Sequence, residues 1–181
     1  MSIEQNILEK LYHQHFNKTF RTAYLITRDY QLAEDATQEA FLRAFSKLST
    51  LREIEKFGSW ISVIAANYSI DLLRKNRKIF LTDQISVHAG SSPDDSPQES
   101  WEKNETSREI REALFLLEPG DREILVLKYF NELSIKEIAS LIEVPTGTVK
   151  SRLFRARKKI RVLVEPSEAG KRQIGEISTK Y

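Results

Sequence analysis

Apolar residues recur at helical rather than strand spacing along most of the chain. The first such stretch covers residues 4–27, and further ones cover residues 31–48 and 60–77. No segment has the strict alternation of apolar and polar positions that is typical of a half-buried strand. The pattern therefore predicts an all-α fold. Residues 49–59, between the second and third stretches, are expected to form a loop with some helical character.

The helical pattern is interrupted after the third stretch. Residues 82–100 mix acidic and turn-forming residues, as in Gly-Ser-Ser-Pro-Asp-Asp-Ser-Pro, and this composition predicts a linker. Helical spacing resumes near Trp101, and a further helix is predicted over residues 121–130. We therefore expect two small helical domains joined by a flexible acidic linker. Their predicted boundaries are 1–80 for the first domain, 81–107 for the linker, 108–164 for the second domain and 165–181 for a polar tail.

A tight pair of helices is predicted over residues 133–160. Ser134 and Glu137 have the spacing of a capping box, in which each side chain satisfies a backbone N–H at a helix start. The first helix should end near Glu143, because Pro145 disfavours helical geometry in the residue before it. Two helices in this arrangement form a helix-turn-helix, whose second helix can enter the major groove of DNA.

The second helix of this pair combines an apolar stripe with a basic outward face. We expect Thr146 to cap it. The stripe consists of Val149, Leu153, Ala156, Ile160 and Leu163. From residue 134 to residue 164 there are eight basic and two acidic residues, a local net charge of +6. A solvated face would explain the charge alone, but its coincidence with a capped helix pair favours contact with phosphates and base edges.

The first predicted domain carries two charged surfaces of opposite sign. The helix over 31–48 has a polar, acidic surface formed by Glu34, Asp35, Gln38 and Glu39. The helix over 60–77 ends in a basic cluster formed by Arg74, Lys75, Arg77 and Lys78. An ordinary solvated face is the simpler interpretation of the first surface. The helix dipole alone favours cations at a C-terminus, so phosphate contact is the functional alternative for the second.

Composition limits the classes of protein that the chain could be. With 181 residues, 40% of them hydrophobic, it can form one or two packed domains. It has no cysteine, which excludes disulfides and thiolate metal sites. No apolar run approaches the roughly 20 residues of a membrane span, and the N-terminus lacks a signal-peptide core. A cytoplasmic protein without direct membrane insertion is expected.

Three blocks of sequence together resemble the extracytoplasmic-function group of sigma-70 factors, the small two-domain sigma subunits of bacterial RNA polymerase. The block that begins Ala33-Glu-Asp-Ala-Thr-Gln-Glu resembles region 2.2 of that family. The block that begins Ser59-Trp-Ile-Ser-Val-Ile-Ala-Ala-Asn-Tyr resembles regions 2.3 and 2.4. The third block, residues 117–157, resembles region 4. They cover most of residues 10–162, in the family's order and spacing.

The resemblance implies a sigma factor that binds core RNA polymerase and directs promoter-specific initiation of transcription. Region 2 would then be the domain over 1–80, which binds the core and reads and opens the −10 element. Its acidic helix would dock on the clamp coiled coil of the largest polymerase subunit. The residues implied in this contact are Glu34, Asp35, Gln38, Glu39, Phe41 and Arg43. Phe41 and Arg43 could instead stabilise the helix.

The −10 reader implied by the resemblance lies in the third helix and the loop before it. The residues implied are Phe57, Trp60, Asn67, Asp71, Arg74, Lys75 and Arg77. Opening a promoter unstacks bases, and aromatic stacking offsets that cost. Of the aromatics Phe57, Trp60 and Tyr68, we expect Trp60 to belong to the core. Asp71 could instead pair with Arg74, three residues further along the helix.

Region 4 would be the domain over 108–164, which reads the −35 element. The residues implied are Arg122, Thr148, Lys150, Ser151, Arg152, Phe154, Arg155 and Arg157, with Arg122 touching phosphate from a neighbouring helix. The family usually has glycine where this chain has Glu143. A left-handed Glu143 would cost roughly 1–2 kcal/mol. An anti-sigma factor is a further implied partner, and it could hold the protein at the membrane.

Two other classes of protein fit the sequence less well. A stand-alone regulator with a carboxy-terminal helix-turn-helix leaves the first two blocks unexplained, and the sequence has no clear effector pocket or phosphoacceptor site. An enzyme is disfavoured, because His13 and His15 do not share a helix face and His88 lies in the predicted linker. No glycine-rich phosphate loop or metal-spaced cluster is present in the sequence. We therefore expect no catalysis, no cofactor and no metal.

Overall fold

A computed structural model of the chain describes residues 3–80 and 105–164. The described residues form helices and turns and contain no strand, which confirms the predicted all-α fold for these ranges. The chain divides into two compact units between Ser92 and Pro93. Most of the predicted linker and all of the predicted tail lie outside the described residues, and the exact domain boundaries stay predictions.

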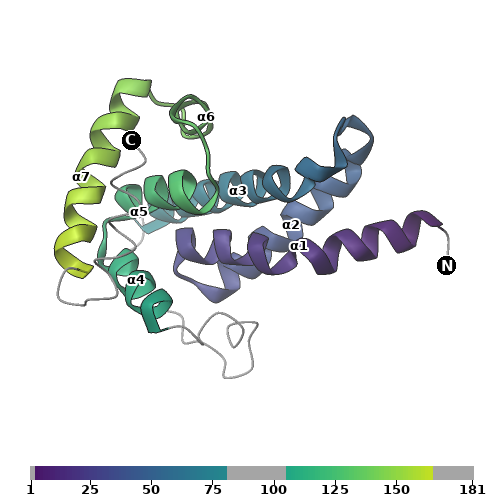
Figure 1. Ribbon diagram of the computed structural model, residues 1–181, viewed down its shortest axis with the longest axis horizontal. Coiled ribbons are helices and arrows are strands. Elements are labelled where there is room, and N and C mark those ends of the chain that lie inside the picture. Colours follow the sequence, from purple (N-terminus) through teal and green to yellow (C-terminus); the bar gives the residue numbers. More distant parts are fainter. Residues whose placement is uncertain (1–2, 81–104, 165–181) are drawn as a thin grey trace. The chain divides into compact units, whose positions relative to one another are not determined.

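The first unit is built on three long helices. Helix α1 spans Ile3–Thr27, α2 spans Tyr30–Ser46 and α3 spans Phe57–Phe80. The three helices lie side by side, and each contacts the other two (Figure 1). The predicted loop between α2 and α3 contains two 3-10 helices, η1 (Leu48–Thr50) and η2 (Ile54–Lys56).

Small residues let α2 lie close to its neighbours. Its fully buried positions include Ala33, Ala36, Ala40 and Ala44, which recur every three or four residues. Leu42, by contrast, is 67% exposed, because it lies on the opposite side of the helix from the alanine stripe. Asp29 begins the helix, and its carboxylate accepts a hydrogen bond from the Leu32 N–H at 2.9 Å.

Helices α1 and α3 approach each other closely at Gly58. A Cβ atom on this residue would lie 2.7 Å from Nδ1 of His15 and 2.8 Å from its Cε1. Both distances are shorter than any ordinary van der Waals contact, so the position needs the absence of a side chain. Burial of the His15 imidazole, together with the nearby charge of Lys18, lowers the pKa of that group.

The second unit is built around the long helix α7 (Thr146–Val164), which contacts α4, α5 and α6. Figure 1 shows α6 beside the start of α7 and α4 beside its end. The elements before α7 are α4 (Glu105–Leu116), α5 (Pro119–Leu125), the π-helical segment η4 (Val126–Phe130) and α6 (Ile135–Leu141). Lys159 ties α7 to α5 by an ion pair, with its Nζ 2.6 Å from Oδ2 of Asp121.

The predicted capping box at the start of α6 is confirmed. The Ser134 N–H donates to Oε2 of Glu137 at 2.8 Å, and the Glu137 N–H donates to Oγ of Ser134 at 3.2 Å. These bonds, followed by the charge of Lys128, lower the pKa of the Glu137 carboxyl, because they stabilise its ionised form.

The turn between α6 and α7 adopts the left-handed conformation considered for Glu143, whose φ is 57°. The Val144 N–H donates to the Ala139 carbonyl at 3.0 Å, which closes a Schellman motif at the end of α6. Thr146 is the first residue of α7 rather than its cap. The Pro145 carbonyl accepts the first bonds of that helix, from the N–H groups of Thr148 and Val149.

The apolar stripe of α7 differs from the prediction at its end. Val149, Leu153 and Ala156 are buried, and Ile160 is half-buried, as expected. Leu163 is exposed, and Val164 takes the buried position instead. The buried stripe therefore continues at Val164, four residues after Ile160, and not at Leu163, three residues after it.

Candidate functional site

The outward face of α2 carries the predicted acidic surface. Asp35 and Gln38 are exposed, and Glu34 and Glu39 are half-buried at its edges. Phe41 does not belong to this surface, because it is only 3% exposed and its ring centroid lies 4.7 Å from that of Tyr12. We therefore correct its predicted contact role: Phe41 stabilises the helix bundle.

Arg43 also has contacts within its own unit. Its Nε lies 2.6 Å from Oε1 of Glu39, one turn earlier on α2. Its guanidinium carbon lies 4.9 Å from the ring centroid of Tyr68 on α3, a cation–π distance. The side chain therefore bridges α2 and α3, in agreement with the stabilising alternative for this residue.

Leu42 also belongs to the acidic face of α2, which we did not predict from the sequence. It lies four residues after Gln38 and seven after Asp35, so the three residues share one side of α2. An exposed leucine among acidic residues offers an apolar anchor inside a charged surface. Leu42 lies at helical spacing, three and four residues, after polar residues of this face, and that spacing could have predicted its exposed position.

Among the described side chains of α3, the fully buried aromatic is Phe57, and Trp60 packs against the core only with part of its surface, which corrects two predictions. Phe57 is 0% exposed, with its ring centroid 5.4 Å from that of His15 and 6.2 Å from that of Phe45. It cannot stack on a base without leaving the core. Trp60 is half-buried and packs edge-on against Phe57 at 6.1 Å, so part of its surface stays open.

The polar residues of α3 continue along the same helix. Asn67, Arg74 and Lys75 are exposed. The Asp71 carboxylate lies 3.7 Å from Nη1 of Arg74, which agrees with the structural alternative for that pair. The predicted contact of Arg77 concerns a side chain outside the described ones, although its backbone belongs to α3.

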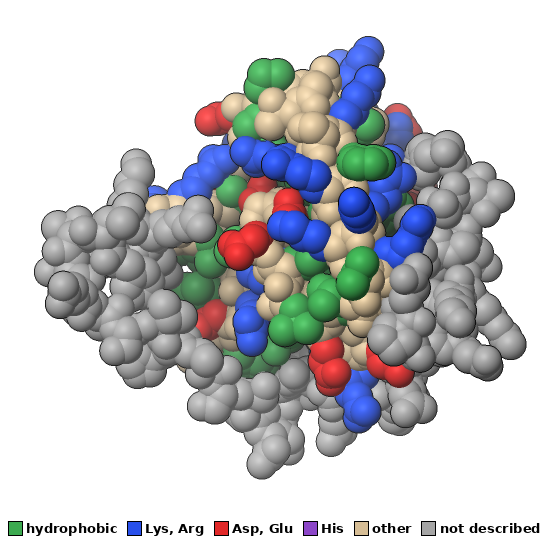
Figure 2. Space-filling model, turned by 90° about the vertical axis from the view of Figure 1, so that its left-hand side faces the viewer, with side chains coloured by type: hydrophobic (Ala, Val, Ile, Leu, Met, Phe, Trp, Pro, Cys, Tyr) green, Lys and Arg blue, Asp and Glu red, His purple; other side chains and the backbone are tan. Residues whose placement is uncertain are grey.

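The outward face of α7 presents most of the predicted DNA-reading residues. Lys150, Ser151, Phe154 and Arg155 are exposed, and Phe154 has 66% of its surface open to solvent. Thr148, Arg152 and Arg157 are half-buried beside them. Figure 2, viewed from the side of α7, shows many Lys and Arg side chains across this face. Because the apolar side of α7 is buried against the rest of its unit, the basic side faces solvent.

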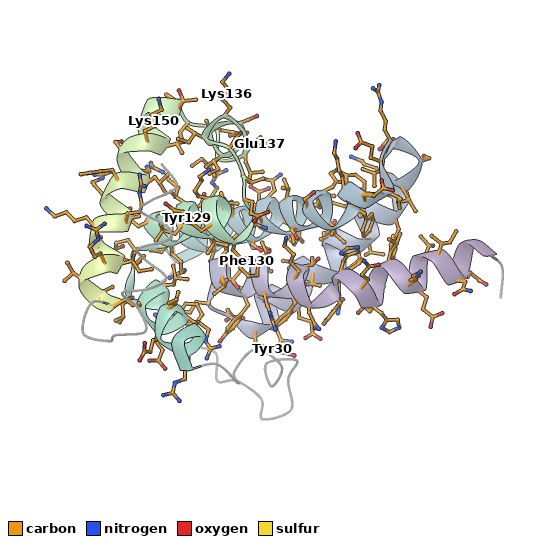
Figure 3. The ribbon with its side chains drawn as sticks, viewed as in Figure 1. Tyr30, Tyr129, Phe130, Lys136, Glu137 and Lys150 are labelled. Carbon is orange, nitrogen blue, oxygen red and sulfur yellow. The ribbon has the colours of Figure 1, made fainter. Side chains whose placement is uncertain are left out.

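Lys136 is a second residue of the site that we did not predict from the sequence. It is exposed on α6, and Figure 3 shows its side chain at the same end of the unit as Lys150 of α7. The first helix of a helix-turn-helix crosses the DNA backbone, where a lysine meets phosphates.

Arg122 is buried, which contradicts its predicted phosphate contact. Only 5% of the residue is exposed. Its Nη1 donates to the Leu117 carbonyl at 3.4 Å, and its guanidinium carbon lies 6.0 Å from the Phe115 ring centroid. Arg122 therefore places a cation against the carboxyl end of α4, where the helix dipole favours it.

Neither a metal-binding cluster nor a membrane-spanning helix is found among the described residues. Within residues 3–80 and 105–164, no three His, Cys, Asp or Glu side chains gather in a way that could hold a metal ion. In the same ranges, no helix has both the length and the apolar character that spanning a bilayer requires.

Comparison with known proteins identifies the family. Residues 11–79 match the family described as Sigma-70 region 2, and residues 107–160 match Sigma-70, region 4. The ECF RNA polymerase sigma factor SigW of Bacillus subtilis (strain 168) is 31% identical over 153 residues, covering 80% of this chain and 82% of its own length. SigM of the same organism is 29% identical over 157 residues, covering 86% and 94%.

Two solved structures share the fold. The sigma factor RpoE, solved with the anti-sigma factor NepR from Bartonella quintana, has a TM-score of 0.64 at 21% identity, covering 87% of this chain and 96% of its own. CnrH, solved with the cytosolic domain of CnrY, has a TM-score of 0.54 at 21% identity, covering 91% of each chain. The chain thus belongs to the extracytoplasmic-function group of sigma-70 factors, which bind RNA polymerase and direct promoter-specific initiation of transcription.

Proposed function

We propose that this sigma factor contacts a promoter at two points, with the first unit reading and opening the −10 element and the second reading the −35 element. The observation that carries the proposal is the exposed face of α7, where Lys150, Ser151 and Arg155 point outward while Val149 and Leu153 fix the helix to its unit. Arginine and lysine contact phosphates and guanine edges, and serine contacts either base class.

The proposed −35 surface consists of residues from both helices of the helix-turn-helix. From α7 it takes Thr148, Lys150, Ser151, Arg152, Phe154, Arg155 and Arg157, and from α6 it takes Lys136. Arg122 is left out because it is buried. Phe154, exposed among cations, suits apolar contact with a thymine methyl group.

The proposed −10 surface lies on α3. Trp60 keeps part of its ring open for an unstacked base, and Asn67 offers an amide that can bond to base edges. Arg74, Lys75 and Arg77 would follow the backbone of the opened strand. Phe57 supports Trp60 from the core rather than contacting DNA.

The proposed polymerase surface is the outward face of α2. Glu34, Asp35, Gln38 and Glu39 would meet a basic partner, the clamp coiled coil of the largest subunit, and Leu42 would anchor the contact. Charge complementarity of this kind steers association and fixes register.

Reconstitution with core polymerase tests the whole proposal. Core enzyme is combined with the full chain, and run-off transcription is measured on a library of genomic promoters. Stimulated initiation at a subset of promoters is expected. The absence of stimulation at every promoter would refute the proposal. DNA binding by the chain alone should be weak until core polymerase is added.

We further propose that an anti-sigma factor regulates this protein. We also propose that the protein acts in the cytoplasm, by binding its partners and without catalysing a reaction. RpoE and CnrH, which share the fold, were each solved with a partner protein, an anti-sigma factor in the case of RpoE. A candidate anti-sigma protein, titrated into the run-off reaction, should suppress initiation, and excess core should restore it. If excess core polymerase does not restore initiation, the candidate protein does not compete with core for the sigma factor, and the proposal is contradicted.

A further inference from the structure

One charged face of the first unit is not part of the surfaces proposed above. From Lys10 to Arg28 the chain carries four lysine and arginine residues and no aspartate or glutamate. Most of this stretch belongs to α1. The neighbouring helix α2 carries three acidic residues and one basic residue, so the two helices differ in the sign of their charge.

The polar side chains of this stretch line one side of α1. They recur at intervals of four, three and four residues, which is the spacing of neighbours on one helix face. Leu11, Thr19 and Ala23 lie on another side of the helix and are buried in the bundle. The polar set, here called the α1 row, consists of the exposed residues Lys10, Gln14, Asn17 and Lys18 and the half-buried Arg21.

From this arrangement we infer that the α1 row is a third DNA-binding surface, which holds backbone phosphates of the promoter duplex. Lysine and arginine contact phosphate oxygens, and the amides of Gln14 and Asn17 can donate to the same oxygens. From Lys10 to Arg21 the row is about 17 Å long, at about 1.5 Å per residue, which equals the length of about five base pairs. Phosphate contacts carry no sequence information, so the row adds affinity to any promoter that the other surfaces select.

The composition of the row favours a polyanion over a protein partner. Protein interfaces depend on a few buried anchors, which are often aromatic, and none of the five residues of the row is apolar. The face of α2 is different, because the exposed Leu42 lies there among acidic residues. Glu9 directly precedes the row in sequence, and its Oε1 lies 3.9 Å from Nε2 of His13.

The inference rests on the proposed promoter binding, and the salt dependence of DNA affinity tests it separately. Each phosphate contact on duplex DNA adds about 0.9 to the slope with which log affinity falls against log salt concentration. Holoenzyme is assembled from core polymerase and the full chain, and a responsive promoter is identified by run-off transcription. Its affinity for that labelled duplex is then measured by fluorescence anisotropy between about 50 and about 200 mM salt.

Removing two cations from the row should reduce this salt dependence. Over the stated range, Lys10→Gln/Lys18→Gln should lose about tenfold less affinity than wild type loses, because two phosphate contacts are gone. The same reduction is expected on a duplex whose −35 and −10 elements are scrambled, since the contacts are independent of sequence. Lys10→Arg/Lys18→Arg keeps both charges and should retain the slope of wild type.

Adding a cation to the row should have the opposite effect. Gln14→Lys should lose about threefold more affinity than wild type over the same range, since it gains one phosphate contact. Gln5→Lys is the matched control, because it makes the same exchange at an exposed position of the same helix. It lies nine residues before Gln14 and therefore on the opposite side of α1, so its slope should equal that of wild type.

Each possible result decides a different claim. If the double glutamine variant and Gln14→Lys both keep the wild-type slope in a holoenzyme that initiates normally, the inference is refuted and the proposed function stands. If the double variant loses affinity for core polymerase instead of DNA, the row binds polymerase and the inference is also refuted. A Gln5→Lys slope as steep as that of Gln14→Lys would show that any added charge has this effect and would overturn the row as a defined surface. If wild-type holoenzyme initiates at no promoter, the proposed function itself fails.

Discussion

At the scale of single residues, burial decides which of two similar side chains belongs to the core. Phe57, Ile61 and Ala65 follow one another every four residues along α3, and all three are fully buried. Trp60 lies one position away from this stripe, and it is only half-buried. Tryptophan is the larger side chain, but its size does not determine which position of the helix faces the core, so residue type alone did not identify the fully buried aromatic.

This difference predicts opposite outcomes for two substitutions. Phe57→Ala should lower the free energy of unfolding by about 3–5 kcal/mol, because it empties a packed core position. Trp60→Ala should cost much less stability but impair promoter opening. Chemical denaturation measures the first effect, and permanganate reactivity of the opened strand in holoenzyme measures the second. Equal losses of stability would contradict the assignment.

The capping residue Glu137 predicts a stability difference that depends on pH. Its pKa is lowered in the folded state by its bonds with Ser134, so its contribution exists above the unfolded pKa and is lost as pH falls through the folded one. Glu137→Gln should therefore be less stable than wild type at pH 7, by at most about 1 kcal/mol, and the difference should disappear once the pH has fallen through the lowered folded pKa. Denaturation curves from pH 7 down into the acid range check this sign.

At the scale of elements, much of the fold could be predicted from the sequence. Helical periodicity gave the long helices, and the spacing of Ser134 and Glu137 gave the capping box. Helix starts were harder, because α3 begins at Phe57, three residues before the predicted start. The contacts of Arg43 and Arg122 depend on which helices pack together, and spacing along one helix does not contain that information.

The turn between α6 and α7 stores backbone strain. Glu143 has a φ of 57°, a conformation that glycine adopts without steric cost. Glu143→Gly should raise the free energy of unfolding of the second unit by about 1 kcal/mol. Glu143→Ala, which keeps the Cβ atom and removes the charge, is the matched control and should give no such gain. Thermal unfolding followed by circular dichroism distinguishes them.

At the scale of the whole molecule, a small net charge conceals a strong segregation of positive and negative charges along the chain. The chain carries only +2 overall, but residues 134–164 alone carry +6, while α2 presents an acidic face. A basic surface attracts phosphates, and an acidic surface attracts a basic protein. A change of charge on one surface should therefore weaken only the binding that this surface provides.

Two substitutions test this separation of roles. Asp35→Lys should weaken binding to core polymerase roughly tenfold and leave the DNA-reading surfaces intact. Arg155→Ala should weaken −35-dependent binding by about 1–3 kcal/mol without reducing affinity for core. Both affinities are measured for both variants, by fluorescence anisotropy with labelled core and with labelled promoter. A variant that loses both would show that the surfaces are not separable.

The close approach of α1 and α3 also limits how this sequence can diverge. Gly58 has room for no side chain because the His15 ring lies where a Cβ atom would stand. If a side chain replaces the hydrogen at position 58, residue 15 has to become smaller or move at the same time. Otherwise the gap between the two helices has to widen. The two positions, 43 residues apart in the chain, are therefore expected to change as a pair during evolution.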